Sequence, residues 1–357
     1  MSKNSTTIQF IKTHWKLLIN IITLVALFVF IYAIRGQLVE TIKNFEKVNG
    51  WVLALVLPLE ALNYHAQVKM YQSLFDAVGT KLSYRKLMKL ALELNFVNHV
   101  FPSGGVTGLS YFGLRLRSED VRAAKSTIVQ AMKLVLVFLS FEILLMLGMF
   151  ILAVNGRASN MTIFIGSSLS TLLIVGTAAF AYLVGSRSRI EAFLTALTAL
   201  LNRIIQVVRP MYPETINIAK ARKVFGEFHE DYNLISSQVD KLNKPFWWAM
   251  VANITEIGVV LLVFIAFGQY VNVGAIILAY AVANFAGLVS VLPGGVGIYE
   301  ALMTAVLATA GVPASVSLPA IVMYRVVNTI IQVPPGYYLY HRSLASGKTQ
   351  RVHYNVS

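Results

Sequence analysis

The chain has 357 residues, of which 57% are hydrophobic and only 13% charged. Because a soluble domain carries far more charge, this composition indicates an integral membrane protein. Lys and Arg exceed Asp and Glu by 30 to 16, and we assign this excess to cytoplasmic loops facing anionic lipid headgroups rather than to nucleic-acid binding. The sequence has no cysteine, which excludes disulfides, thiolate metal sites and a cysteine nucleophile.

Six apolar stretches are long enough to span a bilayer. They cover about Leu17–Ile34, Trp51–Leu74, Ser126–Val154, Met161–Gly185, Phe246–Phe267 and Ser315–Tyr340. Two further apolar segments, about Lys89–Leu114 and Val273–Gly311, are each broken near the middle by Pro and Gly. We therefore predict an all-α polytopic membrane protein, a single membrane domain over residues 1–357, with six full spans and two re-entrant helical hairpins.

Basic residues orient these segments through the positive-inside rule. Positive charges flank the first broken segment at both ends, fill residues 186–245 and lie at both termini, so all of these are predicted to be cytoplasmic in a cell membrane. The second broken segment is bordered by the uncharged residues 268–272 and 312–315, which predicts that it enters and returns outside. Apolar residues recur at helical spacing over 190–208, so the connector 186–245 is expected to contain an amphipathic helix on the inner surface.

The sequence also contains an internal repeat. "NFVNHVFPSGGVTG" at Asn95–Gly108 matches "NFAGLVSVLPGGVG" at Asn284–Gly297 in its Asn-Phe pair, its Pro and its Gly-Gly-Val. We assign a first repeat to residues 15–154, with its hairpin at about 89–114, and a second to residues 161–340, with its hairpin at about 273–311. Because charge gives the halves opposite orientations, the repeat is predicted to be inverted, with a substrate site near the bilayer midplane. Two kinked helices that adapt to packing are the alternative.

The motifs "NHVFPSGGVTG" and "LPGGVGIYEAL" resemble the paired motifs of the lysylphosphatidylglycerol synthase transmembrane family. That family includes the flippase-type membrane domain of the bacterial multiple peptide resistance factor and also stand-alone membrane proteins. The resemblance covers about Trp15–Tyr340 and implies lipid translocation in a bacterial inner membrane. It also implies that the aminoacyl-transferase domain of larger members is absent here. The first motif differs from the family, which often has Gly-Gly-Glu, because residues 107–110 carry no acid.

Charged residues inside the apolar segments are the candidates for function, since each costs roughly 2.5–3.5 kcal/mol on insertion scales. Glu300 directly follows the second glycine motif, and Arg325 on the next span is suited to bind a lipid phosphate through paired hydrogen bonds. Backbone amides of both glycine motifs are placed to bind the same oxygens. The predicted substrate-binding residues are Arg325, Glu300, Gly294, Gly295, Pro293, Tyr299, Asn328, Pro102, Gly104, Gly105, Asn95, Asn98, His99, Asn284 and Glu256. For Glu60, Glu142 and Lys133, an ion pair that locks helices together is an equal alternative.

Two classes of function fit these features. The first is a flippase or scramblase that moves a phospholipid or lipid-linked headgroup between leaflets. The second is an intramembrane glycosyltransferase with a polyprenyl-phosphate donor, or an accessory subunit of a lipid-modifying enzyme. Such glycosyltransferases usually need paired acids in an external loop, and residues 35–50 have Glu40 and Glu46 but no Asp-x-Asp, so we favour a transporter over an enzyme. We expect no catalytic residue, metal or cofactor. The expected partners are anionic membrane lipids, and the sequence does not decide whether the chain forms a homo-oligomer.

Overall fold

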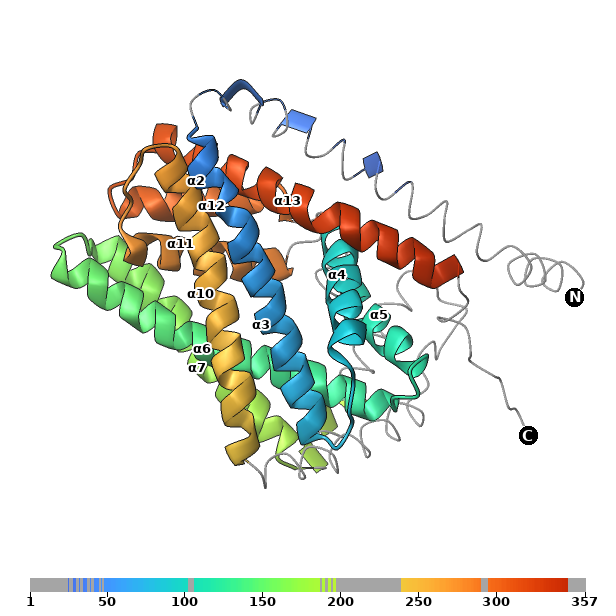
Figure 1. Cartoon of the computed structure of the whole chain (residues 1–357). Helices are drawn as coiled ribbons and strands as arrows, with labels where there is room; N and C mark the ends of the chain where they lie inside the picture. Colours follow the sequence, from blue (N-terminus) through green and yellow to red (C-terminus); the bar gives the residue numbers. More distant parts are fainter. Residues whose placement is uncertain are drawn as a thin grey trace, which may run out of the picture. The chain divides into compact units, whose positions relative to one another are not determined.

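The regular elements are all helical in the part of the chain that the computed structural model describes (Figure 1). That part comprises residues 48–101, 106–186, 239–289 and 295–345, with isolated positions within 25–46 and 188–196. The predicted first span, Leu17–Ile34, and most of the connector 186–245 lie outside the described residues.

The helices follow one another in two series of matching lengths. The first series is α3 (Val56–Ala77, 22 residues), α4 (Tyr84–Val100, 17), α5 (Val106–Arg117, 12) and α6 (Ala123–Val154, 32). The second is α10 (Asn243–Ala266, 24), α11 (Val273–Val289, 17), α12 (Ile298–Thr309, 12) and α13 (Ala314–Ala345, 32). Between them lie α7 (Asn160–Val184) and the short η2 (Val239–Leu242), while α2 (Gly50–Ala54) precedes α3. The duplication seen in the glycine motifs therefore extends to the lengths of the helices around them.

Four of the described helices are long and apolar enough to cross a membrane. They cover Lys125–Val154, Asn160–Leu183, Asp240–Ala266 and Ala314–Leu344, and they coincide with four of the predicted spans. The predicted span Trp51–Leu74 is also helical, but it contains Glu60 and Lys69 and is not among these four. Large apolar side chains on α6 and α7 are exposed, including Phe150 at 65% and Phe164 at 67%, as lipid-facing side chains are.

The chain divides into two compact units. The first comprises Met1–Pro58, Lys89–Phe112 and Ile257–Ser357, and the second comprises Leu59–Met88 and Gly113–Glu256. In the first unit α11 packs against α12, and α12 packs against α13 (Figure 1). In the second unit α6 packs against α7. The described residues that flank both glycine motifs belong to the first unit, which therefore holds the candidate site.

Polar side chains join the apolar helices of the second unit. Asn63 on α3 donates to the carbonyl oxygen of Ala252 (2.8 Å) and to Oγ1 of Thr255 (2.9 Å), both on α10. Asn253 donates to Oγ of Ser140 on α6 at 2.7 Å. Because a buried amide is costly unless it is hydrogen-bonded, these contacts fix the alignment of the three helices.

Two charged residues of the second unit, Glu142 and Lys133, contact neutral groups. Glu142 on α6 accepts a hydrogen bond from Ser170 on α7. The ammonium of Lys133 lies 5.0 Å from the centre of the Tyr71 ring, within the range of a cation–π contact. These contacts join helices, as the structural alternative predicted, but they do so without an ion pair between Glu142 and Lys133.

Candidate functional site

The carboxylate of Glu300 is held at the beginning of α12. Glu300 is the third residue of the helix, and its Oε2 accepts a hydrogen bond of 2.6 Å from the amide of the N-cap residue Gly297. A glutamate in this position satisfies an amide that the helix start leaves open, and its charge faces the positive end of the helix dipole. The carboxylate is therefore fixed by the backbone of the second glycine motif.

Two glycines give that backbone its shape. Gly295 has a φ of 67° and Gly297 a φ of 87°, both in the left-handed region that other residues rarely adopt. Gly295 was among the predicted site residues, as were Gly294 and Pro293, which lie outside the described residues. Gly297 was not among the predicted site residues, although its place at the end of the Gly-Gly-Val-Gly motif was a signal for it.

Arg325 on α13 lies against this carboxylate. Its Nε is 3.5 Å from Oε1 of Glu300, and its Cζ is 4.6 Å from the centre of the Tyr299 ring. Glu300 is 4% exposed and the Arg325 side chain 14% exposed, so the two charges are shielded from solvent. Shielding strengthens both the ion pair and the cation–π contact. The separation is longer than that of a short charge-assisted hydrogen bond, so the two groups form an ion pair at contact distance.

A buried polar stripe extends from Arg325 along α13. Asn328 and Gln332 follow at spacings of three and four residues, which places all three side chains on one face of the helix. Gln332 donates to Oδ1 of Asn328, and Asn328 donates to Oη of Tyr324 at 3.4 Å. Asn328 and Gln332 are both buried.

The first glycine motif brings α4 and α5 together at Asn98 and Gly108. A Cβ atom on Gly108 would lie 2.0 Å from Oδ1 of Asn98, so a larger residue would displace the amide from this position. On the next residue of α4, Nδ1 of His99 lies 2.8 Å from the carbonyl oxygen of Asn95.

The C-terminal half of α13 packs against α4 and α5. A Cβ atom on Gly336 would lie 2.5 Å from the carbonyl oxygen of Leu92 and 2.6 Å from Cβ of Phe96, so glycine permits the close approach of the two helices. The Tyr340 ring lies 5.2 Å from Phe96 and 5.4 Å from Tyr111, measured between ring centres. α13 therefore contacts α12 through its first half, at Arg325, and α4 and α5 through its second half.

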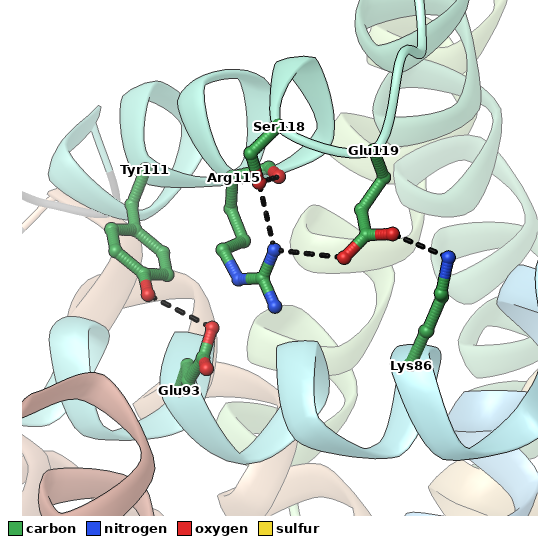
Figure 2. Close-up of polar contacts among 6 residues, drawn as sticks. All are labelled: Lys86, Glu93, Tyr111, Arg115, Ser118 and Glu119. Atoms are coloured by element: carbon green, nitrogen blue, oxygen red, sulfur yellow. Dashed lines mark hydrogen bonds and ion pairs between the residues drawn. The ribbon is translucent and has the colours of Figure 1, made fainter. Parts of the chain in front are cut away.

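Tyr111 also fixes a buried acid. Its hydroxyl donates to Oε2 of Glu93 at 2.8 Å, which joins α5 to α4 one helix turn from the aromatic contacts (Figure 2). Glu93 is 2% exposed, so the hydrogen bond offsets part of the cost of burying its carboxyl group. Sequence reasoning did not place Gly336, Tyr340 or Tyr111 in the site. A glycine after Pro334 and Pro335 in an apolar span was the one available signal.

The structure thus brings together Arg325, Glu300 and Tyr299, and it places Asn328 on the same face of α13 as Arg325. The other predicted site residues have different outcomes. Asn284 donates to the carbonyl oxygen of Tyr280 in its own helix at 2.9 Å, and Glu256 belongs to the second unit. Pro102, Gly104 and Gly105 lie outside the described residues.

Apolar helices of membrane-spanning length, together with a shielded ion pair beside a glycine-broken helix, define a multi-pass membrane protein with charges inside its apolar segments. The family model of the lysylphosphatidylglycerol synthase TM region matches residues 17–336, and the chain belongs to that family. The match confirms the resemblance inferred from the two glycine motifs, and it connects the chain with membrane lipids. A search of the curated proteins found no match.

Proposed function

We propose that the chain is a lipid transporter of the flippase or scramblase type rather than an enzyme, and that it moves a phospholipid or lipid-linked headgroup between leaflets. The observation that carries this proposal is the Arg325–Glu300 pair, shielded from solvent and placed where α13 meets a glycine-broken helix. Charges inside apolar spans are costly and mark substrate pathways more often than they mark ordinary packing. A guanidinium is also the side chain best suited to grip a phosphate through two parallel hydrogen bonds.

In this proposal Glu300 holds the place of the substrate's phosphate while the site is empty. A headgroup phosphate replaces the carboxylate beside Arg325, so the guanidinium exchanges one anion for another. Glu300 keeps its hydrogen bond to the Gly297 amide during the exchange, which limits the cost of losing its cationic partner. The ring of Tyr299 supports the guanidinium from one side and leaves its hydrogen-bonding edge directed at the anion.

We also propose that α4–α5 and α11–α12 are re-entrant hairpins of an inverted repeat. Helices of 17 and 12 residues measure about 26 and 18 Å at 1.5 Å per residue, shorter than the roughly 30 Å hydrocarbon core. The equal lengths of the matching helices in the two series support the repeat. Opposite orientation then places the two hairpins on opposite sides of the membrane.

Cysteine labelling tests this topology in a chain whose sequence has no native cysteine. Arg117 is the last residue of α5 and Ser315 the second residue of α13, and both are exposed. Arg117→Cys should react with an impermeant maleimide only from the cytoplasm, and Ser315→Cys only from outside. Reaction of both from the same side would contradict the inverted repeat.

The transport proposal is tested in proteoliposomes that contain a fluorescent phosphatidylglycerol. Dithionite added outside bleaches inner-leaflet lipid only if the protein moves it, so the wild-type chain should increase the bleached fraction. Arg325→Lys keeps the charge but cannot form two parallel hydrogen bonds to a phosphate, and we expect roughly a 10-fold or larger fall in the rate of translocation. Arg157→Lys, at an exposed loop arginine, is the matched control and should transport at the wild-type rate. Wild-type activity in Arg325→Lys would contradict phosphate binding by Arg325.

A further inference from the structure

Two loops of the second unit that are distant in sequence are tied together at one end of that unit. The ammonium of Lys125 donates to the carbonyl oxygen of Val78 (2.8 Å) and to Oγ1 of Thr80 (3.1 Å). The first contact joins the start of α6 to the loop after α3, and the second adds a side-chain contact in the same loop. Residues 78–83 therefore lie beside the start of α6, which directly follows the loop 118–122.

A single carboxylate adds a second tie between these loops (Figure 2). Oε2 of Glu119 lies 2.5 Å from the ammonium of Lys86 in the first turn of α4, and Oε1 lies 3.2 Å from the guanidinium of Arg115 near the end of α5. Arg115 also donates to Oγ of Ser118 at 2.9 Å. The side chains of Glu119 and Arg115 are 14% and 9% exposed, so this acid neutralises charge inside the network.

The exposed side chains around this network are mostly cationic. We call them the basic surface, which consists of Lys81, Arg85, Lys86, Arg117 and Arg122. Two exposed acids lie in the same region, Asp76 in the last turn of α3 and Asp120 in the loop between α5 and α6. Five cations against two acids leave a positive field, which falls off within a Debye length and acts on anions close to the surface.

Neighbouring apolar side chains place this surface at the level of lipid headgroups. Trp247 near the start of α10 is 59% exposed, and exposed tryptophan is typical of the membrane–water boundary. The next residue, Trp248, contacts the His65 ring at 5.5 Å, and Nδ1 of His65 lies 2.9 Å from Oη of Tyr84 at the start of α4. Leu114, three residues before Arg117 on α5, is 45% exposed. Cationic and apolar side chains are thus exposed together.

We propose that the basic surface binds the headgroup of an anionic phospholipid in the cytoplasmic leaflet, as a lipid-binding site separate from Arg325. Lysines and arginines gathered at a membrane surface attract anionic headgroups through their charge. The exposed Leu114 gives an acyl chain an apolar contact, which a water-soluble anion does not use. The Glu119 network positions the surface because it holds the end of α5 beside the start of α4. This inference stands whether or not the chain transports lipid.

Native mass spectrometry of the full chain tests the proposal, with phosphatidylglycerol and phosphatidylcholine of the same acyl chains in competition. The wild-type chain should retain phosphatidylglycerol preferentially. The triple variant Arg85→Gln, Arg117→Gln, Arg122→Gln should lose roughly 10-fold or more of that preference, because it removes three of the five cations. Arg157→Gln, at an exposed arginine in the loop between α6 and α7, is the matched control and should keep it.

Two further arms separate the alternatives. The charge-conserving triple Arg85→Lys, Arg117→Lys, Arg122→Lys should retain most of the preference, because it keeps the three positive charges. Thermal unfolding of both triples in detergent shows that they are folded. Glycerol phosphate, which has the phosphate but no acyl chains, should not displace the lipid. A glutamine triple with wild-type preference, or an equal loss in Arg157→Gln, would overturn the proposal. Displacement by glycerol phosphate would show a site for free phosphates and would overturn its assignment to lipid.

Discussion

The helix pairs α4–α5 and α11–α12 have equal helix lengths. The polar side chain at the junction, however, lies on the first helix of one pair and on the second helix of the other. Asn95 and Asn284 occupy the same position in α4 and α11, so Asn98 corresponds to Gly287. In the first pair the amide of Asn98 packs against Gly108, the third residue of α5. In the second pair α11 has a glycine there, and the third residue of α12 is Glu300.

The difference between the pairs is one of charge. The first junction is filled by a neutral amide, whereas the second holds a carboxylate that pairs with Arg325. Two helix pairs of equal length therefore differ in the chemistry of their junctions. We infer that the first pair supports α13 through Leu92 and Phe96, while the second carries the ion pair on which the proposed function depends.

Removing Arg325 should have the largest effect on stability. Arg325→Met leaves Glu300 buried without its cation, and breaking a buried pair costs about 3–5 kcal/mol of unfolding free energy. Asn98→Ala in the first pair removes no charge and should cost about 1 kcal/mol or less. Thermal unfolding in detergent measures both variants. Equal losses would show that the charged junction has no special role in stability.

The close contact between α13 and α4 should be the next most sensitive. Gly336→Ala drives a Cβ atom against the backbone carbonyl of Leu92, which cannot rotate away, and we expect a loss of about 1–3 kcal/mol. Gly113→Ala on α5 is the matched control, because a Cβ atom there meets nothing within 4 Å. The control should be neutral or should gain up to about 1 kcal/mol from higher helix propensity. Similar unfolding temperatures for the two variants would contradict the close approach.

Gly108→Ala tests the neutral junction itself. The new methyl group occupies the place of the Asn98 amide, so the variant should lose about 1–2 kcal/mol unless that side chain moves away. In an Asn98→Ala background the same substitution should cost close to nothing, because the space is then free. The double-mutant cycle reports the coupling between the two residues. Additive effects would show that Asn98 and Gly108 do not share the junction.

The smallest expected effect is the pH dependence of the Glu119 network. Burial acts to raise the pKa of Glu119, but hydrogen bonds and charges from Lys86 and Arg115 outweigh it and lower the pKa below its usual value of 4.5. A group with a lowered folded-state pKa contributes stability above its unfolded pKa, and this contribution is lost as the pH falls through the folded pKa.

The stability difference between wild type and Glu119→Gln should therefore be constant above pH 5 and should shrink below about pH 4.5. We expect a difference of about 1 kcal/mol or less, because the Lys86 side chain is 54% exposed and solvent screens its charge. Thermal unfolding at a series of pH values measures it. A difference that grows as the pH falls would contradict the direction of the pKa shift.

Much of this architecture follows from local sequence. Four spans were predictable because long apolar runs must be helical in lipid. The division of the two other apolar segments into α4 and α5, and into α11 and α12, was predictable because Pro and Gly interrupt such runs. Arg325 and Glu300 were both selected as candidates because they are charges inside apolar segments, and the structure places them in contact.

Contacts between distant residues were not predictable in the same way. The hydrogen bond between Tyr111 and Glu93 and the approach of Gly336 to Leu92 depend on how helices pack, and no spacing in the sequence specifies which partner a buried group meets. The Lys86–Glu119–Arg115 network could not be predicted from the sequence for another reason. Each of its charges also fits an ordinary exposed loop, so only the folded chain shows that one acid joins two basic segments.

The central claim is that Arg325 binds lipid phosphate and does more than neutralise Glu300. The most direct test is the double variant Arg325→Met, Glu300→Gln, measured for lipid translocation in proteoliposomes and for thermal unfolding. Removing both charges together avoids a stranded ion, so the variant should unfold near the wild-type temperature. We predict that this stable variant no longer moves phosphatidylglycerol. A double variant that is as stable as wild type and translocates at the wild-type rate would contradict the claim and leave the pair as a structural contact.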